Sequence, residues 1–556
     1  MNIMKVSEYV AEFLYKHGIT DVFTLSGGGA IHLDNAVLNH PNLREICIKN
    51  EATGPMMAEA YARVKNNFGV VLVTTGPGGA NAVTGVVECF VDSSPVMIIS
   101  GQAPVCQTTR NANIQGLRSF GVQELNIIEV VKSITKYAVM IIDKKKIRYE
   151  LEKSLELAKS GRPGPVWIDI PIDIQSADID VDTLFGYDKK GDVLSICEKS
   201  TKIAEDLSKS KRPLILCGQG IKNPSAIKEL KELAELYSCP IIFSRLGLDS
   251  LPYSYKNNMG IGGMRGSYFN KLIMKEADVI LAVGTSMSVA FAGHNLSFIN
   301  PEGHIYMVDI GPEEIMKVRD KLTDSVICDA KQFLNYVIDY TKQSALQLNN
   351  HEDRNLWLGK CIDYKIKFSA KSFAQAKNPI DIYYLAKKVD ELTKENDIFV
   401  DDAGSIYYVA SQILSFEHGT KEITSGAYAS MGLAIPLSIG AAVANPNARI
   451  LTMTGDGSLE TNVQELKTLS YYNLNVKLFV INNGGYISMR DHGRHTSDEK
   501  NAILNLKKVA EAYDMPYYLI DDYKQFDTYL PSFINNIGPA FIEVMCDDQQ
   551  KLILPE

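Results

Sequence analysis

The residues of this chain best suited to chemistry are an aspartate between two glycines, Asp456, and an asparagine 27 residues later, Asn483. Each comes at the end of an apolar run that reads as a β-strand, so both are expected at the carboxyl ends of neighbouring parallel strands, where open α/β sheets bind ligands. A carboxylate and an amide oxygen suit Mg²⁺, which takes a few protein ligands together with substrate phosphates. Gly457 and Ser458 begin the next helix, whose free backbone N–H groups can bind phosphate. The alternative is that Asp456 only forms a turn and Asn483 only a loop tip.

Three further stretches stand out, and the first two of them read as a strand followed by the start of a helix. Glu51 follows the short apolar run 46–48 and begins a helix. The segment 74–81 has the sequence TTGPGGAN, and the segment 424–432 has the sequence TSGAYASMG. For Glu51 the alternative is an ordinary glutamate at a helix start, where the helix dipole favours a negative charge.

These four motifs, in this order and at this separation, resemble those of thiamine-diphosphate-dependent enzymes, in particular the acetolactate synthase-like branch of the large catalytic subunit type. The resemblance extends over essentially the whole chain. It implies that thiamine diphosphate and Mg²⁺ are cofactors, and that Asp456, Asn483 and the backbone carbonyl of Gly485 bind the metal. It also implies that Glu51 hydrogen-bonds a pyrimidine nitrogen of the cofactor and so promotes the tautomer that removes the thiazolium proton.

Further cofactor contacts follow from the same resemblance. Met431 would support the bent shape of the cofactor and the backbone of Ala429 would bind its amine; the alternative for Met431 is an ordinary core methionine. The chain has Ser405-Ile406 where acetolactate synthases usually have Gln-His, so the contact of this segment with the cofactor diphosphate is expected to be weaker. The other expected cofactor-binding residues are Gly78 and Asn81 on the pyrimidine side, Gly404 and Ser405 at a diphosphate-binding turn, and Gly455, Gly457, Ser458, Asn483 and Gly485 around the metal and diphosphate.

Two residues are catalytic candidates beside Glu51. Gln123 matches a glutamine near the reacting centre of acetolactate synthases, and a polar residue at a helix start explains it equally well. His32 lies in the segment 26–33, SGGGAIHL, where acetolactate synthases have Pro-Gly-Gly without the histidine. This version looks more like synthases of surface-sugar pathways, so His32 would either contact substrate or cap the following helix.

The middle of the chain departs from the family at residues that bind flavin and the acceptor. The segment 260–267 and Asp309 resemble flavin-contacting segments. However, Ser286 and Ala290 stand where the family has two arginines, of which one contacts flavin and the other helps to select a 2-keto-acid acceptor. His492 stands where the family has an acceptor-binding tryptophan. Because loss of a guanidinium removes a strong bidentate ligand, both FAD and a plain 2-keto-acid acceptor are left open.

The predicted reaction is thiamine-diphosphate-dependent decarboxylation of a 2-keto acid, with pyruvate as the first candidate, and transfer of the acyl carbanion to an acceptor carbonyl. The alternatives are acetyl transfer to a nucleotide-linked keto sugar in surface-polysaccharide biosynthesis and simple 2-keto-acid decarboxylation. A non-catalytic nucleotide-binding paralogue is a different class, and the joint presence of Glu51, Asp456 and Asn483 argues against it. Polar residues that would suit a hydroxylated or phosphate-bearing acceptor are His32, Glu460, Arg490, Asp491 and Arg494.

Three α/β domains, each a doubly wound parallel sheet, are expected to position these motifs. Alternating apolar strands and helices predict units at 1–180, 190–342 and 370–556. The resemblance implies that these are an N-terminal pyrimidine-binding domain, a central Rossmann-like domain and a C-terminal diphosphate-binding domain. The first and third share the same pattern and length. In the family these two domains meet across a subunit boundary, so a homodimer or homotetramer with active sites between chains is expected.

The composition excludes several classes of protein. A chain of 556 residues is too long for one hydrophobic core. Its net charge of -9 argues against a nucleic-acid-binding surface, and no run reaches the roughly 20 apolar residues of a membrane span. The first residues enter an amphipathic helix rather than a signal peptide, and nine scattered cysteines fit a reducing cytosol. A cytoplasmic enzyme with small-molecule substrates is therefore expected.

Overall fold

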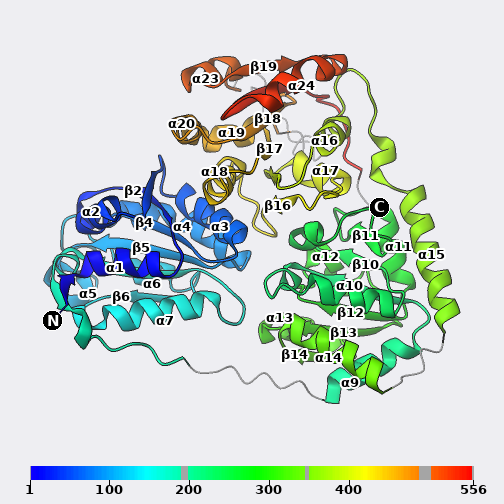
Figure 1. Ribbon diagram of the computed structural model, residues 1–556, viewed down its shortest axis with the longest axis horizontal. Coiled ribbons are helices and arrows are strands. Elements are labelled where there is room, and N and C mark those ends of the chain that lie inside the picture. The colour runs from blue at the N-terminus through cyan, green and yellow to red at the C-terminus, as the bar shows by residue number, and fades with distance from the viewer. Residues whose placement is uncertain (1, 190–197, 345–349, 487–502, 554–556) are drawn as a thin grey trace.

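The computed structural model describes residues 2–189, 198–344, 350–486 and 503–553. These residues form three six-stranded parallel sheets, each covered by helices, which confirms the predicted class of three doubly wound α/β domains. Figure 1 shows the N-terminal unit in blue and cyan, the central unit in green and the C-terminal unit in yellow to red. Parallel strands need long crossover connections, and the helices that supply them bury both faces of each sheet.

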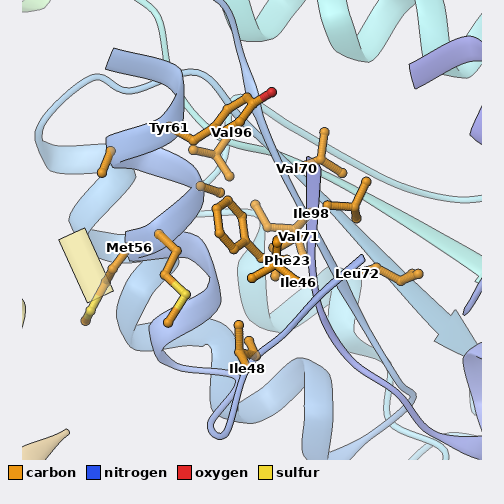
Figure 2. Packing of buried hydrophobic residues seen from close by; sticks show 14 of the residues in the cluster. Phe23, Ile46, Ile48, Met56, Tyr61, Val70, Val71, Leu72, Val96 and Ile98 are labelled. Carbon is orange, nitrogen blue, oxygen red and sulfur yellow. The ribbon is translucent and has the colours of Figure 1, made fainter. Parts of the chain in front are cut away.

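The N-terminal unit has the strand order β3-β2-β4-β5-β7-β6. Its core forms where Phe23, Ile46 and Val71 of three adjacent strands meet Met56 and Tyr61 of helix α3 (Figure 2). The strands are β2 (Asp21–Leu25), β3 (Arg44–Cys47), β4 (Gly69–Val73), β5 (Val96–Gln102), β6 (Tyr137–Met140) and β7 (Val166–Pro171), and a separate antiparallel pair joins β1 (Ile3–Lys5) to β8 (Asp178–Asp180). The helices are α1 (Val6–Lys16), α2 (Ile31–Asn39), α3 (Thr53–Lys65), α4 (Pro77–Val91), α5 (Thr109–Ala112), α6 (Ile127–Val131), α7 (Ile147–Lys159) and α8 (Ile172–Gln175).

The C-terminal unit has the order β16-β15-β17-β18-β20-β19, which is the order of the N-terminal unit when strands are counted along the chain. This match confirms the expected similarity of the first and third units. The strands are β15 (Ile398–Asp401), β16 (Lys421–Ile423), β17 (Ile450–Gly455), β18 (Val476–Asn482), β19 (Tyr517–Ile520) and β20 (Ala540–Met545). The helices are α16 (Ile382–Glu391), α17 (Ser405–Ile413), α18 (Ala434–Ala444), α19 (Asp456–Thr461), α20 (Leu466–Tyr471), α23 (Leu506–Ala512) and α24 (Phe526–Asn535).

The central unit differs, because its order β11-β10-β9-β12-β13-β14 runs in both directions from the first strand. The crevice between β9 and β12 is therefore the point where such sheets bind nucleotides. The strands are β9 (Pro213–Cys217), β10 (Ile241–Phe243), β11 (Asn258–Ile261), β12 (Val279–Val283), β13 (His304–Asp309) and β14 (Asp324–Ile327). The helices are α9 (Glu198–Lys209), α10 (Ile227–Leu236), α11 (Tyr268–Glu276), α12 (Val289–Ala292), α13 (Pro312–Met316) and α14 (Ala330–Gln343), and α15 (His351–Lys367) follows.

The first and third units pack against each other through α3 and α18, which lie next to each other in Figure 1. The two backbones approach closely at Gly440, where a Cβ atom would lie 2.0 Å from the carbonyl oxygen of Met57. Only glycine fits at this crossing. Among the described residues, no helix combines the length and the apolar character needed to cross a membrane.

Candidate active site

Asp456 begins α19 directly after β17, and its carboxylate is enclosed by backbone N–H groups. Its Oδ2 accepts hydrogen bonds from Asn483 at 3.2 Å, Gly484 at 3.0 Å and Gly485 at 3.1 Å, while its Oδ1 accepts one from Gly457 at 2.7 Å. Strands β17 and β18 are parallel neighbours, so the two polar ends meet as expected. Burial raises the pKa of Asp456, and the four N–H groups act in the opposite direction. We call Asp456, Asn483 and Gly485 the Asp456 tip.

The two asparagines after β18 have different surroundings. The Asn482 amide donates to Glu543 at 2.6 Å and its oxygen accepts from the Gly484 N–H at 3.3 Å. The side chain of Asn483 makes no hydrogen bond to any other residue in the described ranges and is half-buried. Its amide oxygen is therefore free to bind a cation beside the Asp456 carboxylate. A single carboxylate with neutral oxygens suits Mg²⁺ that also binds phosphate; the described residues hold no cluster of three His, Cys, Asp or Glu side chains that could bind a metal.

Two glycines leave space beside the Asp456 tip. Gly404 and Gly455 stand at the N-terminal ends of α17 and α19, after the adjacent strands β15 and β17. Within the described ranges, a Cβ atom at either glycine would meet no other atom within 4 Å, and Gly404 has a φ of 95° that favours glycine. Ser405 and Ser458 lie in the first turns of the same two helices. This open edge fits a diphosphate group, whose oxygens would reach backbone N–H groups from two helix starts.

The ring of Tyr486 lies over the start of α19, which the sequence analysis missed. A Cβ atom at Gly457 would lie 2.9 Å from Cε1 of Tyr486, so only a residue without a side chain permits this contact. Tyr486 follows the Asn-Asn-Gly-Gly turn directly and is 44% exposed. An aromatic residue directly after a predicted metal-binding turn was the available signal.

Asp402 joins the strand ends to the 424–432 loop and was also missed. Its carboxylate accepts hydrogen bonds from the N–H groups of Gly432 at 2.9 Å and Ala434 at 3.3 Å, and from the Thr454 hydroxyl at 2.8 Å. It is 1% exposed, and burial raises its pKa to about 6. Asp402 is the second of two acidic residues that follow the apolar run 398–400, and this pair was the available signal.

The 424–432 loop carries Ala429 and Met431. Ala429 has a φ of 53°, which is unusual for a residue other than glycine, and its N–H donates to Ser425 Oγ at 2.8 Å. No N–H or O–H group in the described ranges donates to the Ala429 carbonyl, so this oxygen can accept from a bound amine. Met431 is 39% exposed, which excludes the core methionine considered above. The loop therefore presents a free carbonyl and an apolar side chain together.

In the N-terminal unit, Glu51, Gly78 and Asn81 come together and form what we call the Glu51 group. The Asn81 amide donates to Glu51 Oε2 at 2.7 Å and to Asn50 Oδ1 at 2.9 Å. The other carboxylate oxygen, Oε1, faces Gly78, where a Cβ atom would lie 3.5 Å away. The Asn50 side chain, rather than Glu51, accepts the N–H of Ala52 before α3. The Glu51 carboxylate therefore points to the start of α4 and not to the N-terminal end of α3, the helix that follows it.

Gln123 lies in a loop that touches the same glycine turn. A Cβ atom at Gly76 would lie 1.9 Å from the Gln123 carbonyl oxygen, so the loop rests directly on the backbone before α4. Gln123 is exposed and has a φ of 56°, and the next helix begins only at Ile127. The simple helix-start explanation for Gln123 is therefore wrong. Glu124, which is buried, accepts the N–H of Phe120 at 3.0 Å and holds the loop in place.

His32 lies in the first turn of α2, three residues after Gly29, which contacts the residues between β4 and α4. The N–H of Gly29 donates to Thr74 Oγ1 at 3.2 Å, and a Cβ atom at Gly29 would meet Thr75 at 2.7 Å. The side chain of His32 is half-buried and does not cap α2, whose N-cap residue is Ala30 without a side-chain hydrogen bond. The capping alternative for His32 is therefore wrong.

The Glu51 group and the 424–432 loop lie at different ends of α4 in one chain. Asn81 is near the start of this helix, whereas Asp92 follows its end and accepts the N–H of Gly426 at 2.6 Å. Eleven residues separate Asn81 from Asp92, which corresponds to about 16 Å along a helix.

A cavity of about 1160 Å³ lies at the carboxyl ends of the central strands and extends to the first and third units. Its lining includes Gly262, Asp309 and Ser286, which were compared above with flavin-contacting positions, and Ala290, which stands in the place of the arginine that helps to select the acceptor. Arg265 also lines it, with its guanidinium 4.1 Å from the centre of the Tyr408 ring. The cavity is large enough for a dinucleotide, while its walls have neither of the two family arginines.

The remaining acceptor candidates are not brought together by the described residues. Arg490, Asp491, His492 and Arg494 lie in 487–502, outside the described residues. Glu460 accepts the N–H of Leu504 at 2.8 Å, which gives this carboxylate a partner within the chain.

Comparison with known proteins assigns each of the three units to one enzyme family. Residues 4–124 match the N-terminal TPP binding domain of thiamine pyrophosphate enzymes, residues 200–337 their central domain and residues 402–544 their C-terminal TPP binding domain. The acetolactate synthase large subunit of Buchnera aphidicola from Acyrthosiphon pisum is 30% identical over 528 residues, which cover 92% of this chain and 89% of the relative.

Other relatives come from a plant and from a second bacterium. Chloroplastic acetolactate synthase 1 of Nicotiana tabacum is 30% identical over 99% of this chain and 83% of its own length. The large subunit of acetolactate synthase isozyme 1 of Escherichia coli K12 is 28% identical over 98% of this chain and 94% of its own length. The chain therefore belongs to the thiamine-diphosphate-dependent enzymes, and within them to the acetolactate synthase-like family of carboligating enzymes.

Proposed function

We propose that this enzyme decarboxylates a 2-keto acid, with pyruvate as the first candidate, and joins the remaining acyl group to the carbonyl carbon of an acceptor. Carbon dioxide leaves, a carbon–carbon bond forms, and the acceptor oxygen takes a proton. One observation carries the proposal: the chain has both a Glu51–Asn81 pair and an Asp456 tip with a free Asn483 amide. Thiamine diphosphate would supply the nucleophilic carbon and the electron sink for this chemistry.

The residues of the chain have distinct tasks in this proposal. Asp456, Asn483 and the Gly485 carbonyl hold Mg²⁺, and the open edge at Gly404 and Gly455 accommodates the diphosphate. Asn81 fixes Oε2 of Glu51 and leaves Oε1, which would exchange a proton with a bound pyrimidine. The Ala429 carbonyl would accept the amine of the cofactor, and the Met431 side chain would pack against its rings.

We also propose that the complete site forms between two chains of a homodimer or a homotetramer. Support comes from α4, which presents Asn81 near its start and holds the 424–432 loop of the same chain near its end. A cofactor on that loop would need the Glu51 group of a second copy. A closed two-fold arrangement would satisfy both sites at once.

The acceptor is expected to be a polar carbonyl compound larger than a 2-keto acid. Ala290 cannot form the charged fork by which an arginine holds a carboxylate, so discrimination in favour of such an acceptor would fall. We expect slow acetolactate formation from pyruvate alone and faster pyruvate consumption when hydroxylated or nucleotide-linked keto sugars are added, with products identified by mass. Acetolactate formation at a typical rate of about 10 s⁻¹, unaffected by keto sugars, would instead assign a second pyruvate as the acceptor.

Flavin is expected to occupy the central cavity only weakly or partially. Gly262 and Arg265 remain available in its lining, but Ser286 and Ala290 offer no guanidinium. The measurement is the visible absorption spectrum of the purified enzyme, compared with its protein concentration. A full flavin band at one equivalent per chain would show that Arg265 and the backbone contacts suffice.

A further inference from the structure

The 424–432 loop is held by side chains of the N-terminal unit of the same chain. Glu88, in the last two turns of α4, and Asp92, directly after it, both face the loop, and Arg63 of α3 lies beside them. Ser430 Oγ donates to Glu88 Oε2 at 2.9 Å, the Gly426 N–H donates to Asp92 Oδ2 at 2.6 Å, and Arg63 Nη1 donates to the Thr424 carbonyl at 2.6 Å.

The position of Ser430 connects this contact to the cofactor. Ser430 stands between Ala429 and Met431, the two residues of the loop to which the proposed function gives cofactor contacts. Directly after Met431, the N–H of Gly432 donates a hydrogen bond to the Asp402 carboxylate at 2.9 Å. The loop's own unit also holds it before Met431, because the Tyr407 hydroxyl donates to the Gly426 carbonyl at 3.1 Å. The N-terminal unit adds the hydrogen bonds at Thr424, Gly426 and Ser430.

The cluster behind the loop is buried and acidic. Glu59, Glu88 and Asp92 are each 1% exposed, and Arg63 is the cation among them, 3.6 Å from Glu59. Burial and mutual repulsion raise the pKa of Glu59 to about 8 and that of Asp92 to about 7. One oxygen of Glu88 and one of Glu59 have no hydrogen-bond partner among the residues that the structure describes. Such a cluster costs stability, because hydrophobic residues would fill the same space more favourably.

We propose that Glu88 and Asp92 are positioning residues that hold the 424–432 loop so that Ala429 and Met431 meet the cofactor. This inference rests on the proposed function for the roles of Ala429 and Met431. In this proposal α4 has two tasks. Its first turns carry Gly78 and Asn81, and its C-terminal end holds the 424–432 loop. In the proposed dimer these ends serve two different active sites.

The test compares Glu88→Ala with Glu88→Gln and Ser430→Ala. Glu88→Ala is expected to weaken thiamine diphosphate binding about 10-fold, the size of one hydrogen bond to a charged group. Glu88→Gln keeps an acceptor for Ser430 and is expected to restore most of the affinity. Ser430→Ala removes the same hydrogen bond from the loop side. The double variant of Glu88→Ala and Ser430→Ala should therefore bind thiamine diphosphate no more weakly than either single variant. If Glu88→Ala folds poorly, Ser430→Ala alone tests the same hydrogen bond.

Glu59→Gln is the matched control, because Glu59 belongs to the same buried cluster but bonds to Ser94 of its own unit and not to the loop. It is expected to leave cofactor affinity unchanged. A second readout needs no cofactor: chymotrypsin cleavage after Tyr428, which is 48% exposed on the loop, should be faster in Glu88→Ala than in wild type or Glu59→Gln.

Wild-type affinity and wild-type cleavage in both Glu88→Ala and Ser430→Ala would overturn the positioning role. So would an equal loss of affinity in Glu59→Gln, since the cluster would then act only through general stability. If the wild-type enzyme binds no thiamine diphosphate, the proposed function fails, and the cleavage assay alone decides whether Glu88 holds the loop.

Discussion

Replacing Asp456 with alanine is expected to abolish Mg²⁺-dependent binding of thiamine diphosphate. The substitution removes the only carboxylate of the Asp456 tip and leaves the N–H groups of Gly457 and residues 483–485 without their acceptor. Each buried unpaired group costs about 1–3 kcal/mol, and the cation loses its charged ligand, so affinity should fall by about 100-fold or more. Calorimetry with thiamine diphosphate at saturating Mg²⁺ measures the change.

Asp456→Asn separates the two tasks of this side chain. With its oxygen in the place of Oδ2, the asparagine can still accept the three N–H groups of residues 483–485, so this turn should keep its shape while the negative charge is lost. Its NH2 group then faces the Gly457 N–H, which loses its acceptor. We expect both the thermal stability and the cofactor affinity to lie between those of wild type and Asp456→Ala. Unchanged affinity in both variants would mean that the diphosphate is anchored elsewhere.

Glu51→Gln is expected to lower turnover by about 100-fold or more, the usual scale for a lost acid–base group. The glutamine oxygen can still accept the Asn81 amide, which lies 2.7 Å from Glu51 Oε2, so the fold and cofactor binding should remain nearly intact. The measurement is kcat alongside thiamine diphosphate affinity. Full turnover in this variant would remove Glu51 from the mechanism.

Mixing Glu51→Gln chains with Asp456→Ala chains tests the shared site. In a homodimer with active sites between chains, a mixed dimer has one site with both residues intact, so about one quarter of the sites should be active after random exchange. The two variants alone serve as controls. No recovery of activity after verified exchange would place Glu51 and Asp456 of one site in the same chain.

The Asp456 tip could be predicted from the sequence because it depends on a local pattern. An apolar strand followed by a polar residue puts that residue at the edge of a parallel sheet, and β17 and β18 are consecutive neighbours. The three sheets could be predicted from the alternation of apolar strands and helices along the chain. The hydrogen bond between Glu51 and Asn81 could not be predicted from a local pattern, because two separate strand ends must meet before those side chains can touch.

Contacts between units were beyond sequence reasoning. Nothing in the segment around Glu88 or Asp92 indicates that it will meet residues 426 and 430, more than 330 positions away. Asp402 was missed for a different reason: a buried acid after a strand looks like any turn residue until its partners, Gly432 and Thr454, are known. Long-range hydrogen bonds of this kind depend on how whole elements pack.

The most direct test of the central claim is to incubate the enzyme with ¹³C-labelled pyruvate, with and without thiamine diphosphate and Mg²⁺, and to identify labelled products by mass and magnetic resonance. We expect labelled carbon dioxide and a ligated acyl product only when both cofactors are present, with yield increased by a polar carbonyl acceptor. No turnover of pyruvate or other 2-keto acids at saturating cofactor, with any acceptor, would contradict the account.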